Sequence, residues 1–225
     1  SPFFKKYLEK QKVDLKKVIH YPYYAEAFYK PVTSTNEVTN KFPEGFNILF
    51  AGNIGTAQSF DTIVEAIDLI KKEQINIVVL GDGRDKERSQ KKIKTLGLSH
   101  KFYFLGSHPP ESMPEYFAAA DALLITLKKA DIFSYTIPGK LQSYLACGKP
   151  IIGALDGIGK QIIEVSNSGL CVDAEDVVGL SENIIKMNKI PPKELLTFGN
   201  NGLDYFNNHF NKEKLLNDFE AILKG

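Results

Sequence analysis

Short runs of continuous apolar residues alternate with amphipathic segments from about residue 46 onward. The apolar runs cover residues 47–51, 75–80, 102–105, 122–126 and 150–154. Strands without polar alternation are buried on both faces, as in parallel sheets whose crossovers are helices. The alternation therefore predicts an α/β fold, a doubly wound parallel sheet of the Rossmann-like kind.

The segments between these runs show helical spacing. In 59–71, Phe60, Ile63 and Ile67 recur on one face, and Ser59 is a candidate N-cap. Ser112 and Glu115 form a capping-box pattern before a helix that reaches Ala120. Further helices are expected at 3–10, 82–96, 158–166, 175–188, 191–208 and 213–224, with strands at 17–21 and 170–172.

Glycine-bearing turns follow the first three apolar runs. These turns contain Gly52 and Gly55, then Gly81 and Gly83, then Gly106, and a loop at 127–140 follows the fourth run. Ligands of open α/β sheets bind outside the carboxyl ends of the strands. The turns are therefore expected to converge on one crevice.

The stretch SYTIPGKLQSYLACGKPI, residues 134–151, places Pro138, Gly139 and Lys140 at the start of a helix with almost no acid nearby. The first N–H groups of a helix are unpaired and carry the positive end of its dipole. Gly139 permits close approach of a ligand, and Lys140 adds a full charge. The stretch predicts an anion site, with an ordinary helix start and a solvated lysine as the alternative.

Other chemistries lack their sequence signals. The first turn, AGNIGTAQS, is not a G-x-G-x-x-G fingerprint, and Gly81 stands where a ribose-binding acid would close the second strand. No phosphate-loop lysine motif or G-x-S-x-G elbow occurs. The four histidines have no metal-ligand spacing, so no metal is expected, and a solvated turn explains Asp82 and Asp85 better than a cation site does.

Composition narrows the class of protein further. The 28 Lys and Arg nearly balance 27 Asp and Glu, which argues against nucleic acid as a partner. No apolar run reaches the roughly 18 residues of a membrane span, and the opening SPFFKKYLEK lacks the apolar core of a signal peptide. Cys147 and Cys171 lie in apolar contexts that favour reduced thiols, so a cytoplasmic location is expected.

The ordered set FAGNIG, VVLGDGR, FYFLGSHPPESMPEYFAAADALLIT, ACGKPI and GIGKQIIEVSNSGLCVD resembles the donor-binding, C-terminal half of GT-B-fold glycosyltransferases of family 4, the group 1 glycosyltransferases. The resemblance covers about residues 46–190. It implies three parts. Residues 1–44 would be a remnant of an N-terminal domain with the linker, 45–190 the nucleotide-sugar-binding domain, and 191–225 helices of which the last packs against the N-terminal domain.

The resemblance also implies a retaining transferase that binds a nucleotide sugar, in particular a UDP-sugar, without a cofactor or a metal. The expected donor-binding residues are Gly52, Asn53, Gly55, Gln58, Gly83, Arg84, Gly106, His108, Tyr135, Pro138, Gly139, Lys140 and Ser143. Lys140 would stabilise the leaving diphosphate. The nucleobase of the donor would lie near Gly106 and His108. Arg84 is equally compatible with a surface salt bridge.

Two departures from the family pattern concern charge. Tyr135 and Ser143 stand where the family carries a Glu-x7-Glu pair, whose second Glu commonly holds the donor ribose. Gln58 and Ser59 replace a Lys-Gly pair that helps bind the diphosphate. Ribose binding must therefore differ in this chain, and Lys140 would supply the missing charge from another place.

The combined motifs resemble a bacterial subgroup that builds O-antigen and capsule and includes N-acetyl-L-fucosamine transferases. This implies an acceptor glycan or polyprenyl-diphosphate sugar bound through the N-terminal domain, with peripheral contact at the inner face of the cytoplasmic membrane. Two alternatives remain open: a GT-B-fold UDP-sugar 2-epimerase, which the scarcity of acids at 127–143 disfavours, and a non-enzymatic Rossmann-like nucleotide-binding module.

Overall fold

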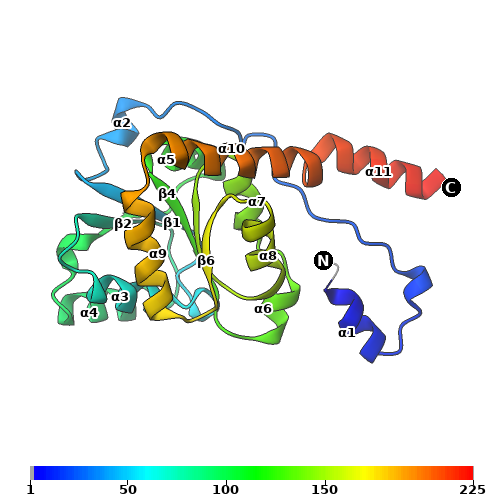
Figure 1. Cartoon of the computed structure of the whole chain (residues 1–225), viewed down its shortest axis with the longest axis horizontal. Coiled ribbons are helices and arrows are strands. Elements are labelled where there is room, and N and C mark those ends of the chain that lie inside the picture. Colours follow the sequence, from blue (N-terminus) through cyan, green and yellow to red (C-terminus); the bar gives the residue numbers. More distant parts are fainter. Residues whose placement is uncertain (1–2, 225) are drawn as a thin grey trace.

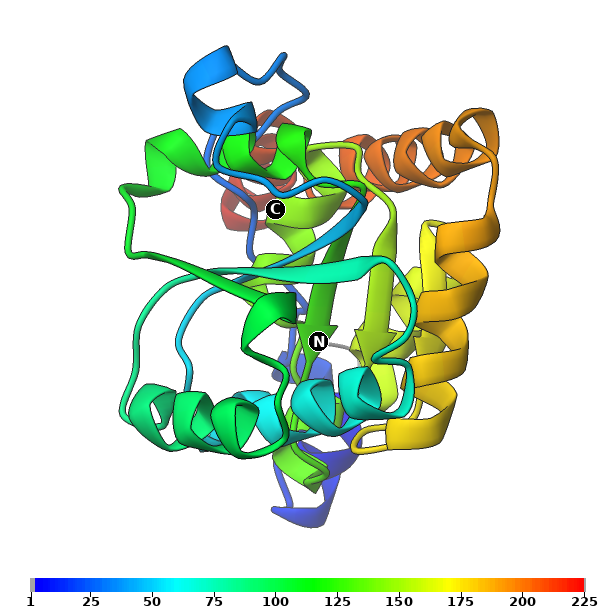
Figure 2. The same ribbon diagram turned by 90° about the vertical axis from the view of Figure 1, so that its left-hand side faces the viewer.

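The computed structural model describes residues 3–224, and its centre is a six-stranded parallel sheet (Figures 1 and 2). The strand order is β3-β2-β1-β4-β5-β6. The strands are β1 Phe46–Ala51, β2 Ile75–Leu80, β3 Phe102–Gly106, β4 Ala122–Thr126, β5 Ile151–Ala154 and β6 Gly169–Val172. This is the order of the Rossmann fold, and it confirms the predicted doubly wound sheet.

Helices connect the strands and continue after the last one. They are α1 Phe4–Lys10, α2 Asn36–Thr39, α3 Phe60–Leu69, α4 Lys86–Thr95, α5 Met113–Ala119, α6 Asp131–Tyr135, α7 Gly139–Ala146, α8 Gly157–Val165, α9 Val177–Lys189, α10 Pro192–His209 and α11 Lys212–Lys224. Short 3-10 turns lie at Leu15–Lys17, Thr56–Gln58, Ser99–Lys101 and Pro110–Ser112. The short helices α2 and α6 lie in segments expected to be irregular.

The two faces of the sheet form two separate cores, because successive strand side chains point to opposite faces. Leu49 of β1 and Leu123 of β4 pack on one face under α5, α7, α8 and α10. Ile48 and Leu124 pack on the other face under α3, α4 and α9. Helices on both faces bury β2 and β4 completely, which explains why the sequences of these strands carry no polar alternation.

Three local expectations are wrong. Residues 17–21 do not form a strand: Lys17 ends the 3-10 turn Leu15–Lys17, and residues 18–21 pair with no strand of the sheet. Ser59 precedes α3 in a left-handed conformation, and its hydroxyl does not cap the helix but pairs with Thr62 and Glu175. Ser112 and Glu115 form no capping box, since the Ser112 hydroxyl donates to the Pro109 carbonyl and Glu115 accepts from Thr35.

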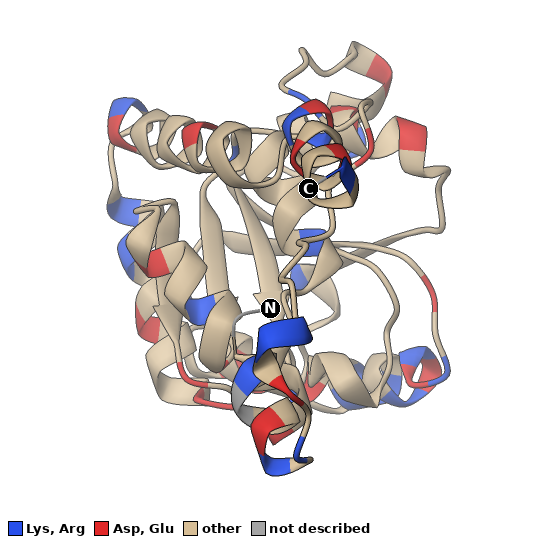
Figure 3. Cartoon of the chain, turned by 90° about the vertical axis from the view of Figure 1, so that its right-hand side faces the viewer, with Lys and Arg blue, Asp and Glu red and all other residues tan. Residues whose placement is uncertain are grey.

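The N-terminal segment and α11 extend away from the sheet and its covering helices (Figure 1). On the face drawn in Figure 3, Lys and Arg are interspersed with Asp and Glu over these peripheral helices. Within residues 3–224, no helix combines the length and the apolar character needed to cross a bilayer.

Candidate functional site

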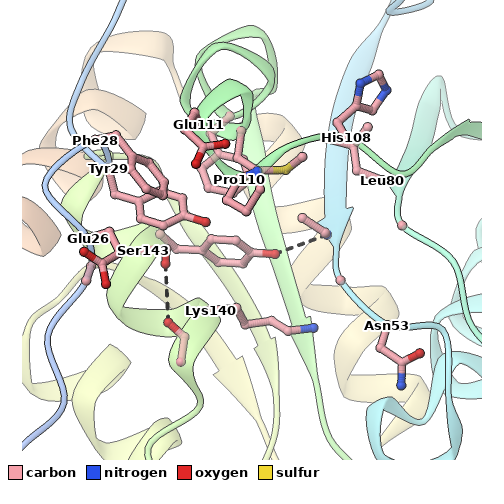
Figure 4. A pocket seen from close by; sticks show the side chains of 18 of the residues that line it. Glu26, Phe28, Tyr29, Asn53, Leu80, His108, Pro110, Glu111, Lys140 and Ser143 are labelled. Carbon is pink, nitrogen blue, oxygen red and sulfur yellow. Dashed lines mark hydrogen bonds between the residues drawn. The ribbon is translucent and has the colours of Figure 1, made fainter.

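A cavity of about 890 Å³ opens at the carboxyl ends of β1, β2 and β3, beside the first turn of α7 (Figure 4). This is the crevice expected where the strand order reverses between β1 and β4. Its size suits a small organic ligand. The chain segments that line it are 51–53 and 80–82 after the first two strands, 107–117 after the third, 139–144 of α7, and 23–29 of the connecting segment.

The ends of the first two strands approach each other too closely for a side chain at Gly81. Gly52 and Gly81 have φ of 134° and 135°, a region that L-residues rarely adopt. A Cβ atom on Gly81 would lie 2.0 Å from the Gly52 carbonyl oxygen. The glycines therefore allow the first two turns to pack together and leave the floor of the cavity free of side chains.

Lys140 projects from α7 along this floor toward Gly52, and a Cβ atom on Gly52 would lie 3.1 Å from its Nζ atom (Figure 4). The Nζ atom is buried and has no hydrogen-bond partner among the described residues. It lies 4.5 Å from the centroid of the Phe50 ring, a cation–π contact that offsets only part of the lost hydration. Burial lowers the pKa of Lys140 to about 8. An unpaired buried ammonium in a cavity is a site for an anion.

The first turn of α7 adds backbone donors beside this ammonium. Pro138 occupies the N-cap position and provides no side-chain acceptor for the first N–H groups. The first turn contains no acidic residue, and Gly139 leaves the space in front of it open, since a Cβ atom there would have no neighbour within 4 Å. The helix N-terminus and Lys140 therefore present positive potential to the same cavity.

Tyr144 fixes α7 against the sheet. Its ring is fully buried, and its hydroxyl accepts from the Ala51 N–H at 3.2 Å and donates to the Leu124 carbonyl at 3.4 Å. Burial raises the pKa of this phenol, so it remains a donor. Because Ala51 directly precedes Gly52, this contact sets the position of α7 relative to the floor of the cavity.

The connecting segment before the sheet contributes a wall that the sequence motifs do not indicate. Tyr23, Glu26, Phe28 and Tyr29 line the cavity, although they lie far from the strand-end turns in sequence. The aromatic run YPYYAEAFY was the available signal, since exposed linkers seldom carry so many aromatic side chains.

His108 and Glu111 lie on the loop after β3. One tautomer of His108 satisfies both of its neighbours, with Nε2 donating to the Leu105 carbonyl at 3.0 Å and Nδ1 accepting from the Tyr116 hydroxyl at 3.2 Å. Glu111 lies farther along this loop, at the mouth of the cavity (Figure 4). The loop thus has a fixed imidazole and an exposed carboxylate.

The structure brings six of the expected donor-binding residues together around the cavity: Gly52, Asn53, His108, Gly139, Lys140 and Ser143. The other seven do not line it: Gly55, Gln58, Gly83, Arg84, Gly106, Tyr135 and Pro138. Two of these, Gly83 and Gly106, pack directly against residues of the lining. A Cβ on Gly83 would lie 2.5 Å from the Asn53 Oδ1, and the Gly106 carbonyl accepts from the Gly81 N–H.

Three of the outlying residues make contacts of other kinds. Arg84 donates to the Thr56 hydroxyl at 3.0 Å. The backbone carbonyl of Gln58 accepts a hydrogen bond from the Thr126 hydroxyl. The side-chain Oε1 of Gln58 is buried and has no hydrogen-bond partner among the described residues. Tyr135 packs its ring near Phe4 and Tyr7 of the N-terminal segment. Of the two positions that stand where the family carries its Glu-x7-Glu pair, only Ser143 lines the cavity.

Groups of three or more His, Cys, Asp or Glu that could hold a metal ion are absent from residues 3–224. Cys147 and Cys171 are free thiols, and burial raises the pKa of each to about 12. These thiols are un-ionised at neutral pH and lie outside the cavity lining.

Comparison with known proteins matches residues 33–204 to the family model of the group 1 glycosyl transferases. A putative colanic acid biosynthesis glycosyl transferase, WcaI of Escherichia coli K12, is 25% identical over 182 residues. The match covers 79% of this chain and 43% of that protein. The chain thus spans less than half the length of this relative.

Solved structures show the same fold. A glycosyltransferase from Rickettsia africae superposes with a TM-score of 0.84 at 18% identity, covering 100% of this chain and 61% of that one. Anabaena HepE, solved in complex with UDP and glucose, gives a TM-score of 0.71 at 17% identity. The match covers 88% of this chain and 54% of the HepE chain. Since the family model matches well over half of its residues, the chain belongs to the group 1 glycosyl transferases.

Proposed function

We propose that the cavity binds the diphosphate of a nucleoside-diphosphate sugar, and that the chain is the donor-binding half of a retaining glycosyltransferase. The observation that carries the proposal is the buried, unpartnered Lys140 ammonium beside the N-terminus of α7. Family membership agrees with this ligand class.

The same positive groups would assist the reaction. When the sugar leaves, negative charge develops on the phosphate nearest to it. Lys140 and the N–H groups of the first turn of α7 are fixed in place before the reaction, so they need little reorganisation to stabilise that charge. In the turn at 52–55, the Gly52 and Ile54 N–H groups donate to the Leu80 and Asp82 carbonyls, so the N–H of Asn53, which lines the cavity, is the further candidate donor. The base that activates the acceptor would belong to a part of the protein beyond this chain.

UDP-sugar is the donor we favour, because the HepE structure of the same fold is described as a complex with UDP. The acceptor would be a growing surface polysaccharide or its polyprenyl-diphosphate-linked precursor, in keeping with the colanic acid relative. We also propose that the protein belongs to family 4 and to its fucosamine transferase subgroup, and that it works at the membrane surface.

Calorimetry with UDP tests the proposal on Lys140. Lys140→Ala removes the ammonium, and the dissociation constant should rise about 5- to 150-fold, as for loss of a charge-assisted contact worth about 1–3 kcal/mol. Lys128→Ala serves as the matched control, because Lys128 is exposed and lies outside the cavity lining. Its affinity should stay within twofold of the unaltered chain.

Two results would count against the proposal. Absence of measurable heat with UDP, GDP and ADP alike would remove nucleotide binding from the function. Binding that Lys140→Ala leaves unchanged would place the nucleotide elsewhere on the molecule.

A further inference from the structure

The cavity is chemically different at its two sides. The floor near Lys140 is positive, as described above. The opposite wall carries two carboxylates, Glu26 and Glu111, on either side of the Tyr29 ring (Figure 4). A diphosphate would be attracted to the first side and repelled by the second. A part of the ligand other than the diphosphate would therefore contact this wall.

Tyr29 is held in place from several directions. Its ring stacks on Phe117 of α5 with centroids 6.1 Å apart and planes 10° apart, and its backbone N–H closes a turn onto the Glu26 carbonyl at 2.9 Å. The Ser143 side chain of α7, whose hydroxyl donates to the Gly139 carbonyl at 3.5 Å, lies beside the Tyr29 hydroxyl. Burial, with weaker contributions from Glu26 and Glu111, raises the pKa of this phenol, so it stays protonated.

The two carboxylates of this wall form few stabilising interactions with the rest of the protein. Glu111 forms no ion pair within residues 3–224, and Glu26 has one exposed pair with Lys212 at 3.5 Å. Exposed pairs of this kind contribute little to folding. Two nearly unused acceptors beside a fixed hydroxyl therefore suggest a role toward a ligand.

Carboxylate, phenol and serine hydroxyl groups together suit the hydroxyls of a sugar ring, since a diol donates two O–H groups and a carboxylate accepts both. Phe28 and Met113 line the cavity beside this wall and offer apolar surface to a flat base. A nucleoside places its base directly next to its ribose. The wall thus fits the nucleoside end of the ligand better than the transferred sugar.

We propose that Tyr29 and Glu111, with Glu26 and Ser143 beside them, bind the 2′,3′-diol of the nucleotide ribose. The inference rests on the proposed function. It assigns part of the nucleotide site to residues 23–29, which lie outside the 33–204 segment matched to the family. It also places the ribose contact on the connecting segment and on the loop after β3. In this chain α7 carries only the short Ser143 at the position where the family has a Glu.

Paired ligands test the inference. UDP should bind the unaltered chain about tenfold more tightly than 2′-deoxy-UDP, because the deoxy ligand leaves a carboxylate without its hydrogen bond. Tyr29→Phe and Glu111→Gln should each weaken UDP binding about five- to tenfold and weaken binding of 2′-deoxy-UDP, which keeps only the 3′-hydroxyl, by about two- to threefold. Glu111 is exposed, so its variant keeps the test valid if Tyr29→Phe fails to fold.

Tyr24→Phe is the matched control, since Tyr24 belongs to the same segment but does not line the cavity. It should preserve the preference for UDP. Equal affinity of the unaltered chain for UDP and 2′-deoxy-UDP would overturn the ribose assignment and leave the proposed function intact. So would variants that weaken both ligands equally, or that weaken a UDP-sugar but not UDP. If no nucleotide binds, the proposed function and this inference fail together.

Discussion

Burial of an unpaired ammonium costs free energy, and Lys140 carries that cost in the ligand-free protein. Its Nζ atom has no described hydrogen-bond partner, and burial lowers its pKa from 10.5 to about 8. The unfolded chain therefore binds the proton more tightly than the folded chain does. The penalty is fully present below pH 8, shrinks as the pH rises from 8 to 10.5, and is absent above that range.

Lys140→Met should therefore stabilise the protein at pH 7. The expected gain is about 2–3 kcal/mol, because Met is shorter than Lys by only the terminal atom and removes the charge. The gain should disappear by about pH 10.5, where the lysine is neutral in both states. Urea denaturation of both proteins at pH 7 and pH 10 measures the difference. A gain that is the same at both pH values would show that packing, and not charge, is responsible.

The same substitution should abolish tight UDP binding, so stability and ligand affinity should change in opposite directions. This opposition is expected where a group is held in place for a ligand rather than for folding. Loss of both stability and affinity in Lys140→Met would mean that the ammonium has a partner within the fold.

At the scale of elements, the contact between α7 and α10 depends on a glycine. A Cβ on Gly199 of α10 would lie 2.1 Å from the carbonyl oxygen of Gly148, which follows α7. Gly202, one turn further along α10, is less tight, with Leu145 Cδ2 at 3.0 Å and Ser168 Cβ at 3.1 Å. The backbone cannot yield as a side-chain end can, so the two positions should differ strongly.

Gly199→Ala should destabilise the protein by about 3 kcal/mol or more, because α10 must move away from α7. Gly202→Ala should cost less than about 1 kcal/mol, since the higher helix propensity of alanine offsets part of the crowding. Thermal or urea unfolding of the two variants provides the comparison. Similar stability of both would show that the end of α7 shifts freely to accept the methyl group.

The elements themselves could largely be predicted from the sequence, because burial on both faces leaves a continuous apolar run that is easy to recognise. The strand expected at 17–21 rested on only Val18 and Ile19 between polar neighbours, and this segment pairs with no strand of the sheet. Caps were also misassigned: Ser59 and Ser112 have the right residue type, but both hydroxyls bond elsewhere. A side chain with several nearby acceptors cannot be assigned from spacing alone.

At the scale of the whole molecule, the site could be predicted only where it is local. Gly52 and Lys140 could be predicted because Gly52 directly follows a strand and Lys140 lies at the start of a helix. Tyr29 and Glu26 reach the cavity because the connecting segment folds back over α7, a tertiary path that no local pattern encodes. Tyr135 shows the reverse case, since its place in a motif predicted a site residue while its ring packs against the N-terminal segment.

The whole molecule also divides into a packed body and a loosely attached arm. Of α11, only Leu215 is buried, while Leu216, Phe219 and Leu223 are exposed to 45%, 41% and 71%. Its described contacts with the rest of the chain include a Tyr21–Phe219 ring contact at 5.0 Å and the exposed Lys212–Glu26 pair. In contrast, α10 packs along α7 and buries Gly199, Gly202 and Phe206.

Hydrogen exchange should therefore separate the two helices. Amides of α11 should exchange at least about a hundredfold faster than those of α10, and those of β1 and β4 should be slowest, because local opening of α11 exposes little buried surface. The apolar face of α11 fits the expectation that this helix packs against a preceding domain. In a longer chain that includes such a domain, the α11 amides should become as slow as those of α10. Equally slow exchange of α11 in the 225-residue chain would contradict the loosely attached arm.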